Sequence, residues 1–390
     1  MREGWEYKKL GDVCTIERGG SPRPIADYIT ESADGINWIK IGDAVEGSKY
    51  ILFTKEKIRP EGIKKSRFVH KGDVILSNSM SFGKPYILGI DGCIHDGWLV
   101  LHDNNNTFSK DYLYYVLSSP IMYSKFTQLA VGGVVNNLNS NIVREVVVAI
   151  PPLSTQLSIV SELDKINELI RLKKEQLKDY DNLAQSIFYE MFGDPVVNEK
   201  GWDFKKIGEI GTVERGAGIS KKDFVEDGLP CIHYGQLHTI LGPTTRHHHS
   251  CIPESLLPKY KIAHTNDVIM AITSEDVEGS CKSTAWLGNY DIVIGSDAAI
   301  LHHEQDGTFL SYYTMTKAFF NEKSKYAKGF KVTHISAKEI ENIPVYLPPL
   351  ALQKDFAKRI EVIEQQKENI KSTIQDLETL LASRMQYWFD

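Results

Sequence analysis

Two long stretches of the chain space their apolar residues in alternating steps of four and three, the pattern of one face of a coiled-coil helix. They start at Ile159 and Phe356, and each follows a Pro-Pro pair and runs for about five heptads. Gly193 and Pro195 mark the end of the first helix, because Gly caps a helix and Pro cannot continue one. The predicted seam residues are Ile159, Leu163, Ile166, Ile170, Leu177 and Ile187 in the first helix, and Phe356, Ile360, Ile363, Ile370, Ile374 and Leu377 in the second.

These apolar seams allow two interpretations. An amphipathic helix ordinarily lies on its own domain and buries the seam there. Two seams occur in this chain in the same register, and each is too long for a neighbouring domain of this size to cover. The pattern therefore favours pairing of the two helices with each other.

The blocks 1–150 and 200–347 follow a different pattern, in which short β-branched and aromatic runs alternate with Gly-, Asn- and Ser-rich turns. Each block is predicted to be an α+β domain with a mainly β core. A helix is expected at 111–128 in the first block and at 309–328 in the second. Strands are expected at 37–41, 73–76, 98–101, 146–150, 268–272, 292–294 and 343–347.

The chain contains an internal repeat. The segments 4–11, 15–19 and 150–156 match 201–208, 212–216 and 347–353, always at an offset of 197 residues. Between these segments the agreement is poor, apart from 73–76 against 267–270. A duplicated unit follows, with matching ends and a different middle.

The composition is that of a globular protein. Of 390 residues, 42% are hydrophobic and 25% are charged, and at about 150 residues per domain this length predicts two to three domains. No apolar run reaches the roughly 18 residues of a membrane span, and the charged start lacks the apolar core of a signal peptide. The five cysteines form no CxxC pair, which indicates reduced thiols and a cytoplasmic protein.

Signatures of catalysis are missing from the sequence. It contains no phosphate loop, serine elbow, HExxH pair or dinucleotide-binding GxGxxG, and no Asn-Pro-Pro-aromatic loop of an amino-methyltransferase. The adjacent residues His247, His248 and His249 do not suit one metal ion, because neighbouring side chains of an extended segment point to opposite faces. We therefore predict no catalytic residues, no metal site and no cofactor.

The net charge of -6 neither supports nor excludes nucleic acid, since the two larger blocks are close to neutral. Basic residues cluster at 55–71 and 317–334, either as phosphate contacts or as a solvated lysine-rich surface. The polar loops 77–79 and 131–137 could read bases or simply form turns. The candidate DNA contacts are Ser21, Arg23, Lys64, Lys65, Arg67, Asn78, Ser79, Lys84, Asn136, Asn137, Lys221, Lys222, Gln236, Arg246, Lys282, Lys328, Lys331 and His334.

The order of these features resembles the specificity subunit of type I restriction-modification systems. The resemblance rests on the repeat start Gly-Trp-x-x-Lys-Lys-[Leu/Ile]-Gly with Glu-Arg-Gly after it, on the hydrophobic-Pro-Pro-Leu-x-x-Gln junction, and on the helix end at 188–195. These motifs cover about half of the chain and, except for the helix end, occur twice in the same order. No single motif is highly specific, whereas the repeated order is.

The resemblance implies two target-recognition domains separated by two long antiparallel coiled-coil helices, with approximate two-fold symmetry. The implied parts are 1–153 and 196–350 for the domains, and 154–195 and 351–390 for the helical regions. It implies a non-catalytic chain that binds double-stranded DNA, reads a bipartite target with an unread spacer, and joins two methyltransferase subunits and restriction subunits, away from any membrane. One rival is a DNA-modifying enzyme, which the missing cofactor loop disfavours. The other is a duplicated coiled-coil interaction scaffold that binds no nucleic acid.

Overall fold

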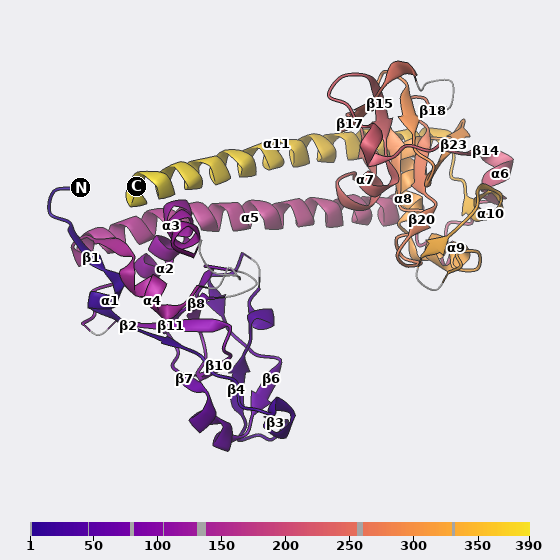
Figure 1. Cartoon of the computed structure of the whole chain (residues 1–390). Coiled ribbons are helices and arrows are strands. Elements are labelled where there is room, and N and C mark those ends of the chain that lie inside the picture. Colours follow the sequence, from indigo (N-terminus) through magenta and orange to yellow (C-terminus); the bar gives the residue numbers. More distant parts are fainter. Residues whose placement is uncertain are drawn as a thin grey trace. The chain divides into compact units, whose positions relative to one another are not determined.

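The computed structural model of the chain describes residues 2–45, 47–78, 82–103, 105–130, 138–255, 260–329 and 332–390. Its contacts divide the chain into two units, Met1–Lys174 with Ser372–Asp390, and Glu175–Lys371. Each unit holds one domain together with part of each of two long helices, α5 (Leu153–Phe192) and α11 (Leu350–Phe389) (Figure 1).

The first domain contains two larger sheets and one short strand pair in its described residues. The short pair joins β1 (Glu6–Lys9) to β12 (Val147–Ile150) in antiparallel register. The central sheet has the order β2 (Cys14–Arg18), β11 (Trp98–Asp103), β8 (Val74–Ser77), β9 (Pro85–Leu88) and β5 (Tyr50–Ile51). The outer sheet has the order β3 (Ile29–Thr30), β6 (Glu56–Ile58), β4 (Ile36–Ile39), β10 (Gly92–Ile94) and β7 (Arg67–Val69).

The central sheet of the first domain is buried on both faces. Leu99 and Leu101 of β11 pack in a core that also holds residues of the helices α2 (Lys110–Ser118), α3 (Pro120–Ala130) and α4 (Ser140–Glu145). Trp98 and Val100 pack in a second core with Ile39 and Ile94 of the outer sheet. Successive side chains of a strand point to opposite faces, so the continuous apolar run of β11 reflects a strand between two layers.

The second domain repeats this topology. Its central sheet has the order β14 (Gly211–Arg215), β23 (Ala298–His303), β19 (Val268–Ala271), β21 (Ser283–Trp286) and β16 (Thr244–Thr245). Its outer sheet has the order β17 (Ser250–Ile252), β15 (Leu229–Ile232), β22 (Ile292–Ile294) and β18 (Lys261–Ala263). Further pairs are β13 (Phe204–Lys206) with β25 (Pro344–Tyr346) and β20 (Thr273–Ser274) with β24 (Thr333–His334). The duplication thus extends through the middle of the unit, where the sequences differ.

The two predicted helices at 111–128 and 309–328 are wrong as single elements, because each consists of two helices. In the first domain α2 ends at Ser118 and α3 starts at Pro120, whose ring lacks an N–H and disfavours the helical conformation of the residue before it. In the second domain α8 (Gly307–Thr314) ends before Thr316, whose hydroxyl accepts a hydrogen bond from the backbone N–H of Phe319 at 3.3 Å and caps α9 (Lys317–Lys323).

The paired helices run antiparallel within each unit. In the first unit the carboxylate of Glu162, near the start of α5, binds the guanidinium of Arg384 and accepts a 3.0 Å hydrogen bond from Trp388 Nε1, near the end of α11. In the second unit Phe188 of α5 packs edge-on against Phe356 of α11, with ring centroids 5.6 Å apart. Of the predicted seam residues, Leu177, Ile187 and Leu377 are half-buried and the others are buried.

The helix ends also belong to the domain cores. Ile159 and Leu163 of α5 lie in the core of the first domain, and Phe356 and Ile360 of α11 lie in that of the second. Both interpretations of the seams therefore apply, since each helix starts on a domain and pairs with the other helix within each unit. The predicted α+β class, with two mainly β domains and long helices, is confirmed.

Candidate nucleic-acid interface

The Glu-Arg-Gly motif of each repeat fixes a loop against the parallel strands of the outer sheet. Arg18 Nε donates a hydrogen bond to the carbonyl of Asp96 at 2.9 Å, and Arg215 Nε donates to the carbonyl of Ser296 at 3.0 Å. The glycine of the motif also makes the same contact in both domains. The backbone N–H of Gly19 donates to the carbonyl of Trp98, and that of Gly216 donates to the carbonyl of Ala298, both at 2.9 Å. The motif recognised in the sequence thus has a structural role that is the same in both domains.

The loop after this motif borders a pocket in the first domain. The strands β4 and β10 run parallel, and Lys40 and His95 follow directly after their carboxyl ends. Glu56 of β6 lies beside them, with its Oε1 2.5 Å from Lys40 Nζ. We call this pocket, which has a volume of about 660 Å³, the β4/β10 site. The residues that line it are Ser21, Pro22, Arg23, Pro24, Ile25, Trp38, Lys40, Glu56 and His95.

Hydrogen bonds hold several side chains of the β4/β10 site in place. Asp96 Oδ1 accepts from Ser21 Oγ and from His95 Nε2, both at 2.9 Å. The other ring nitrogen of His95 accepts from the backbone N–H of Gly97 at 2.9 Å. Arg23 is different, because its side chain is 82% exposed and, among the described residues, its one ionic contact is with Asp96 at 3.9 Å. The site therefore combines hydrogen-bonded side chains with the exposed guanidinium group of Arg23.

The second domain has a corresponding place beyond β15 and β22, which are also parallel and which we call the β15/β22 site. His233 follows β15, and its Nδ1 accepts from the N–H of Gly235 at 3.1 Å, which leaves the proton on Nε2 as a donor. Burial lowers the pKa of His233, and the nearby charge of Lys221 lowers it further. Gln236 bridges this histidine to β17, because its Nε2 donates to Ser250 Oγ at 3.0 Å.

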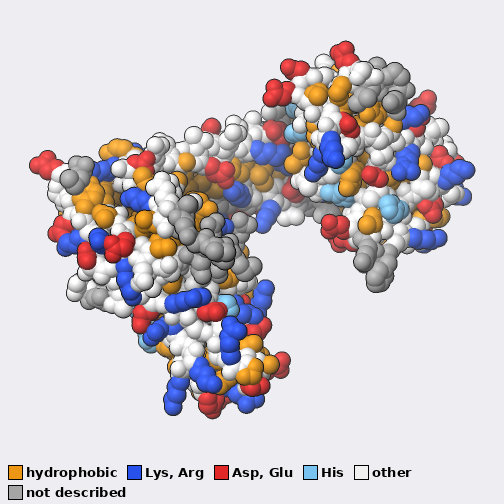
Figure 2. Space-filling view, viewed as in Figure 1, with side chains coloured by type: hydrophobic (Ala, Val, Ile, Leu, Met, Phe, Trp, Pro, Cys, Tyr) orange, Lys and Arg blue, Asp and Glu red, His pale blue; other side chains and the backbone are white. Residues whose placement is uncertain are grey.

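Several predicted contacts lie around these two sites or on nearby surface. Ser21 and Arg23 line the β4/β10 site. Lys221 and Lys222 form the short turn that enters the β15/β22 site, and both are exposed. Lys64 and Lys65 are exposed at the end of a short 3-10 helix that precedes β7 of the outer sheet of the first domain. On the face seen in Figure 2, the Lys and Arg side chains of this domain are mixed with acidic ones.

Other predicted contacts have partners within the protein, either in the core or at the surface. Asn78 is only 1% exposed, and its Nδ2 donates to the carbonyl of Asp96 at 2.9 Å, so its position does not support a base contact. Arg67 pairs with Glu17 at 3.2 Å. Arg246 pairs with Glu361 of α11 at 2.6 Å. Each of these three side chains thus already has a partner in its own unit.

The remaining candidates divide into described and undescribed residues. Lys84 is exposed, and so is Lys282, whose Nζ donates to the carbonyl of His238 at 3.1 Å. Lys328 and His334 are brought together by a backbone bridge, and both are exposed. Ser79, Asn136, Asn137 and Lys331 lie outside the described residues.

Sequence reasoning missed Lys40, Glu56 and His95. They come from three separate segments, which are brought together by the parallel pairing of β4 with β10 and the antiparallel pairing of β4 with β6. The one local signal was a polar residue directly after a buried apolar run, as Lys40 follows Trp38 and Ile39. Such a signal occurs at most strand ends and could not single out this site.

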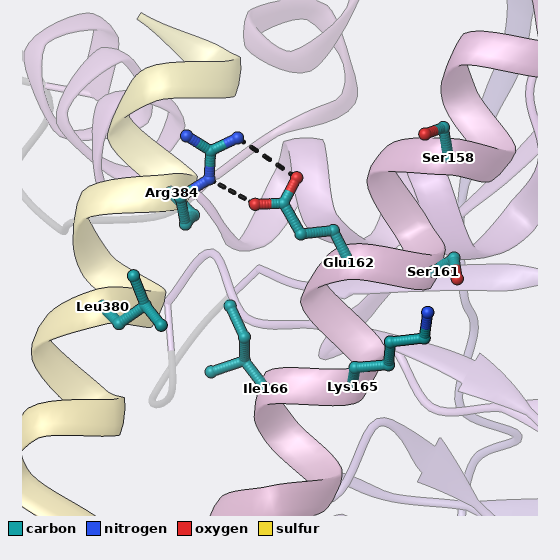
Figure 3. Close-up of a pocket in the computed structure, with 7 residues that line it drawn as sticks. All are labelled: Ser158, Ser161, Glu162, Lys165, Ile166, Leu380 and Arg384. Atoms are coloured by element: carbon teal, nitrogen blue, oxygen red, sulfur yellow. Dashed lines mark hydrogen bonds and ion pairs between the residues drawn. The ribbon is translucent and has the colours of Figure 1, made fainter.

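A second hollow lies between the helices of the first unit (Figure 3). It has a volume of about 530 Å³ and is lined by residues of α5 and α11, including Ser158, Lys165 and Leu380. Glu162 and Arg384 face each other across it, and the bonds from Arg384 hold the pKa of Glu162 below its usual range. Because the two side chains neutralise each other, we assign the Glu162–Arg384 ion pair to the pairing of α5 with α11.

The described residues offer no cluster of His, Cys, Asp and Glu that could hold a metal ion. In the predicted histidine loop, His248 Nδ1 lies 2.7 Å from the hydroxyl of Tyr290, whereas His247 and His249 are exposed. Among the same residues, none of the helices is long and apolar enough to cross a membrane.

Comparison with known proteins identifies the family. The family described as "Type I restriction modification DNA specificity domain" matches residues 2–179 and 199–379, one match for each repeat, and the chain belongs to this family. The predicted resemblance is confirmed. The type I restriction enzyme MjaVIII specificity subunit of Methanocaldococcus jannaschii is 23% identical, over 97% of this chain and 92% of that protein. The EcoKI specificity subunit of Escherichia coli K12 is 21% identical over 47% of this chain and 40% of its own length.

Solved structures show the same fold. One comes from a study of complex assembly and conformational transition of the type I R-M system; it superposes with a TM-score of 0.63 at 20% identity, over 99% of this chain and 97% of its own. The S subunit of the type I system of M. genitalium gives a TM-score of 0.55 at 13% identity, over 99% of this chain and 96% of its own.

Proposed function

We propose that this chain is the DNA-recognition subunit of a type I restriction-modification complex and that its two domains read the two halves of a bipartite target. The observation that carries the proposal is one framework used twice with different side chains. Arg18 and Arg215 fix the same loop in the two domains, whereas Lys40 and His233 differ at the strand ends beside it. Two domains with the same framework and different side chains at the strand ends suit the recognition of two DNA half-sites of different base sequence.

The chain supplies recognition and not chemistry in this proposal. Its partners are double-stranded DNA, two methyltransferase subunits that carry out the modification, and restriction subunits in the full complex, in the cytoplasm. Residues 1–153 and 196–350 are the two reading domains. The regions 154–195 and 351–390 form the helical spacer, so that the base pairs between the two half-sites remain unread.

Mapping of modified bases in host DNA tests this function. Cells that carry the chain and its methyltransferase subunit should modify one bipartite sequence, and cells that lack only this chain should not. The pure chain, incubated with labelled S-adenosylmethionine and the same DNA, should transfer no methyl group. Methyl transfer by the chain alone, or modification without a sequence pattern, would contradict the proposal.

Lys64 and Lys65 are predicted to contact phosphates and not bases. Changing either residue to alanine should weaken binding to all DNA sequences alike. A lysine that neutralises a DNA phosphate releases a counterion from the DNA but does not read the base sequence. The slope of log affinity against log salt should fall by about one. The measurement is titration of labelled duplex by the assembled complex at several salt concentrations. Lys165→Ala on α5 removes the same charge and should leave the slope unchanged.

A further inference from the structure

We propose that Lys40 and Glu56 of the β4/β10 site together read one base-pair edge in the half-site of the first domain. The inference rests on the proposed function and names the residues that give it one element of its specificity. The feature read is an exocyclic amino group beside a carbonyl oxygen in the major groove. Cytosine N4 beside guanine O6 and adenine N6 beside thymine O4 both present this pair of groups.

The geometry of the ion pair matches such an edge. Lys40 Nζ and Glu56 Oε1 are 2.5 Å apart, so a donor and an acceptor stand side by side. Their side chains are 32% and 39% exposed, and both line the pocket. A lysine donates to a base carbonyl and a glutamate accepts from a base amino group, which makes the pair complementary to a neighbouring carbonyl and amino group.

The surroundings of the pair keep its position defined. The backbone N–H of Lys40 donates to Asp43 Oδ2 at 2.8 Å, and Asp43 is buried. Glu56 lies opposite Trp38 in the ladder between β6 and β4, and Trp38 is 1% exposed. The two charged groups therefore project from β6 and from the residue that follows β4, at places held by packing and a backbone hydrogen bond, which is the arrangement a specific contact needs.

The repeat supplies an internal comparison. The pairing of β15 with β17 sets Cys231 opposite Ser250, as the pairing of β4 with β6 sets Trp38 opposite Glu56. The second domain thus has Ser250 in place of Glu56, and at the next strand end it has His233 in place of Lys40. Neither charge persists although the backbone pairing does.

Comparison of the two domains also distinguishes residues that maintain the fold, which recur in both, from residues that could read DNA, which differ. The loop contact made by Arg18 recurs in Arg215, and the bond from Gly19 to Trp98 recurs between Gly216 and Ala298. The second domain joins the equivalent places by neutral groups, because Gln236 Nε2 donates to Ser250 Oγ and Gln236 Oε1 accepts from the backbone N–H of His233. The fold therefore does not require an ion pair at this place, which leaves the two charges of the first domain available for reading DNA.

Arg23 adds a contact of a different kind at this site. Its side chain is 82% exposed at the rim of the pocket and is free to reach a phosphate of the strand being read. Arg23 is thus assigned to positioning, and Lys40 with Glu56 to the base pair itself.

The test uses the assembled complex and maps modified bases across DNA. Glu56→Gln should relax the preference at one base pair of one half-site by about tenfold, because an amide donates as well as accepts. Glu31→Gln is the matched control, since Glu31 is exposed in the same domain and does not line the pocket. The identity of that base pair in the unaltered target shows whether cytosine N4 or adenine N6 is read.

A double variant with Lys40→Glu and Glu56→Lys sharpens the test. It keeps an ion pair between β4 and β6 but exchanges donor and acceptor, so the preference should move to the inverted base pair at the same position. The other half-site and the spacer should stay the same. Thermal unfolding of both variants is measured in parallel, and the Glu56→Gln result decides the matter if the double variant unfolds.

Three results would overturn the proposal. They are unchanged base preference in folded, active Glu56→Gln complexes, a change in both half-sites, and a change equal to that of the Glu31→Gln control. In each case the unaltered complex still modifies a bipartite sequence, so the proposed function survives. Absence of any sequence pattern with the unaltered complex would instead contradict the proposed function itself.

Discussion

Replacing Gly19 by alanine should destabilise the first domain by about 3 kcal/mol, because a methyl group there has no room. A Cβ at this position would lie 2.2 Å from the carbonyl oxygen of His95 and 2.7 Å from that of Ile94. Both atoms belong to the backbone around the end of β10, so neither can turn away as a flexible side chain would. Gly216→Ala should have the same effect on the second domain, where the oxygen of Gly295 lies 2.1 Å away.

Chemical and thermal unfolding of the purified variants, with hydrogen exchange to assign the loss to one domain, measure this effect. Gly42→Ala and Gly218→Ala are the matched controls, since a Cβ at either position meets nothing within 4 Å. The controls should stay within about 0.5 kcal/mol of the parent. Equal stability of the Gly19→Ala variant and its control would contradict the role assigned to the Glu-Arg-Gly loop.

The long apolar patterns could be predicted because their signal is repeated over many residues. Ile159 and Phe356 start seams that the structure buries, and strand 292–294 was placed at its observed bounds. The division of each domain helix was missed because the apolar spacing continues across Ser119 and Thr316, and only the local chemistry of Pro120 and of the Thr316 cap interrupts the backbone.

The candidate site could be predicted only in part. The sequence found Ser21 and Arg23, which lie next to the repeated Glu-Arg-Gly motif. It also proposed Asn78, whose residue type suits a base contact but whose side chain fills a buried place equivalent to that of Ile272 in the second domain. Burial of a polar side chain depends on strands that are distant in sequence, and no composition or spacing reveals it.

The common topology of the two domains was also hidden in their sequences. The strand orders of the two central sheets agree, although the middle segments showed little identity. The equivalent strands share a pattern in which successive apolar side chains point into different cores. Ile75 and Leu76 do so in the first domain, and Ile269 and Met270 do so in the second. Many apolar residues satisfy that requirement, so a fold can persist while the residues at its strand ends change.

Inserting one heptad into each long helix should lengthen the unread spacer by about three base pairs, if the helices set the distance between the half-sites. Seven residues add about 10 Å of helix, and a base pair occupies about 3.4 Å. Copies of residues 168–174 after Lys174 and of 365–371 after Lys371 keep both seams in phase. These points are also where the two units divide, so neither domain core is disturbed.

Modification-site mapping of the doubly extended chain beside the parent gives the spacer directly, and both half-sites should remain the same. A heptad in α5 alone is the control, and it should destabilise the chain because the added turns have no partner on α11. Within each unit the present partners would be preserved, including Glu162 with Arg384 and Lys367 with Asp181 at 2.8 Å. A folded and active double variant with an unchanged spacer would show that something other than these helices sets the distance between the half-sites.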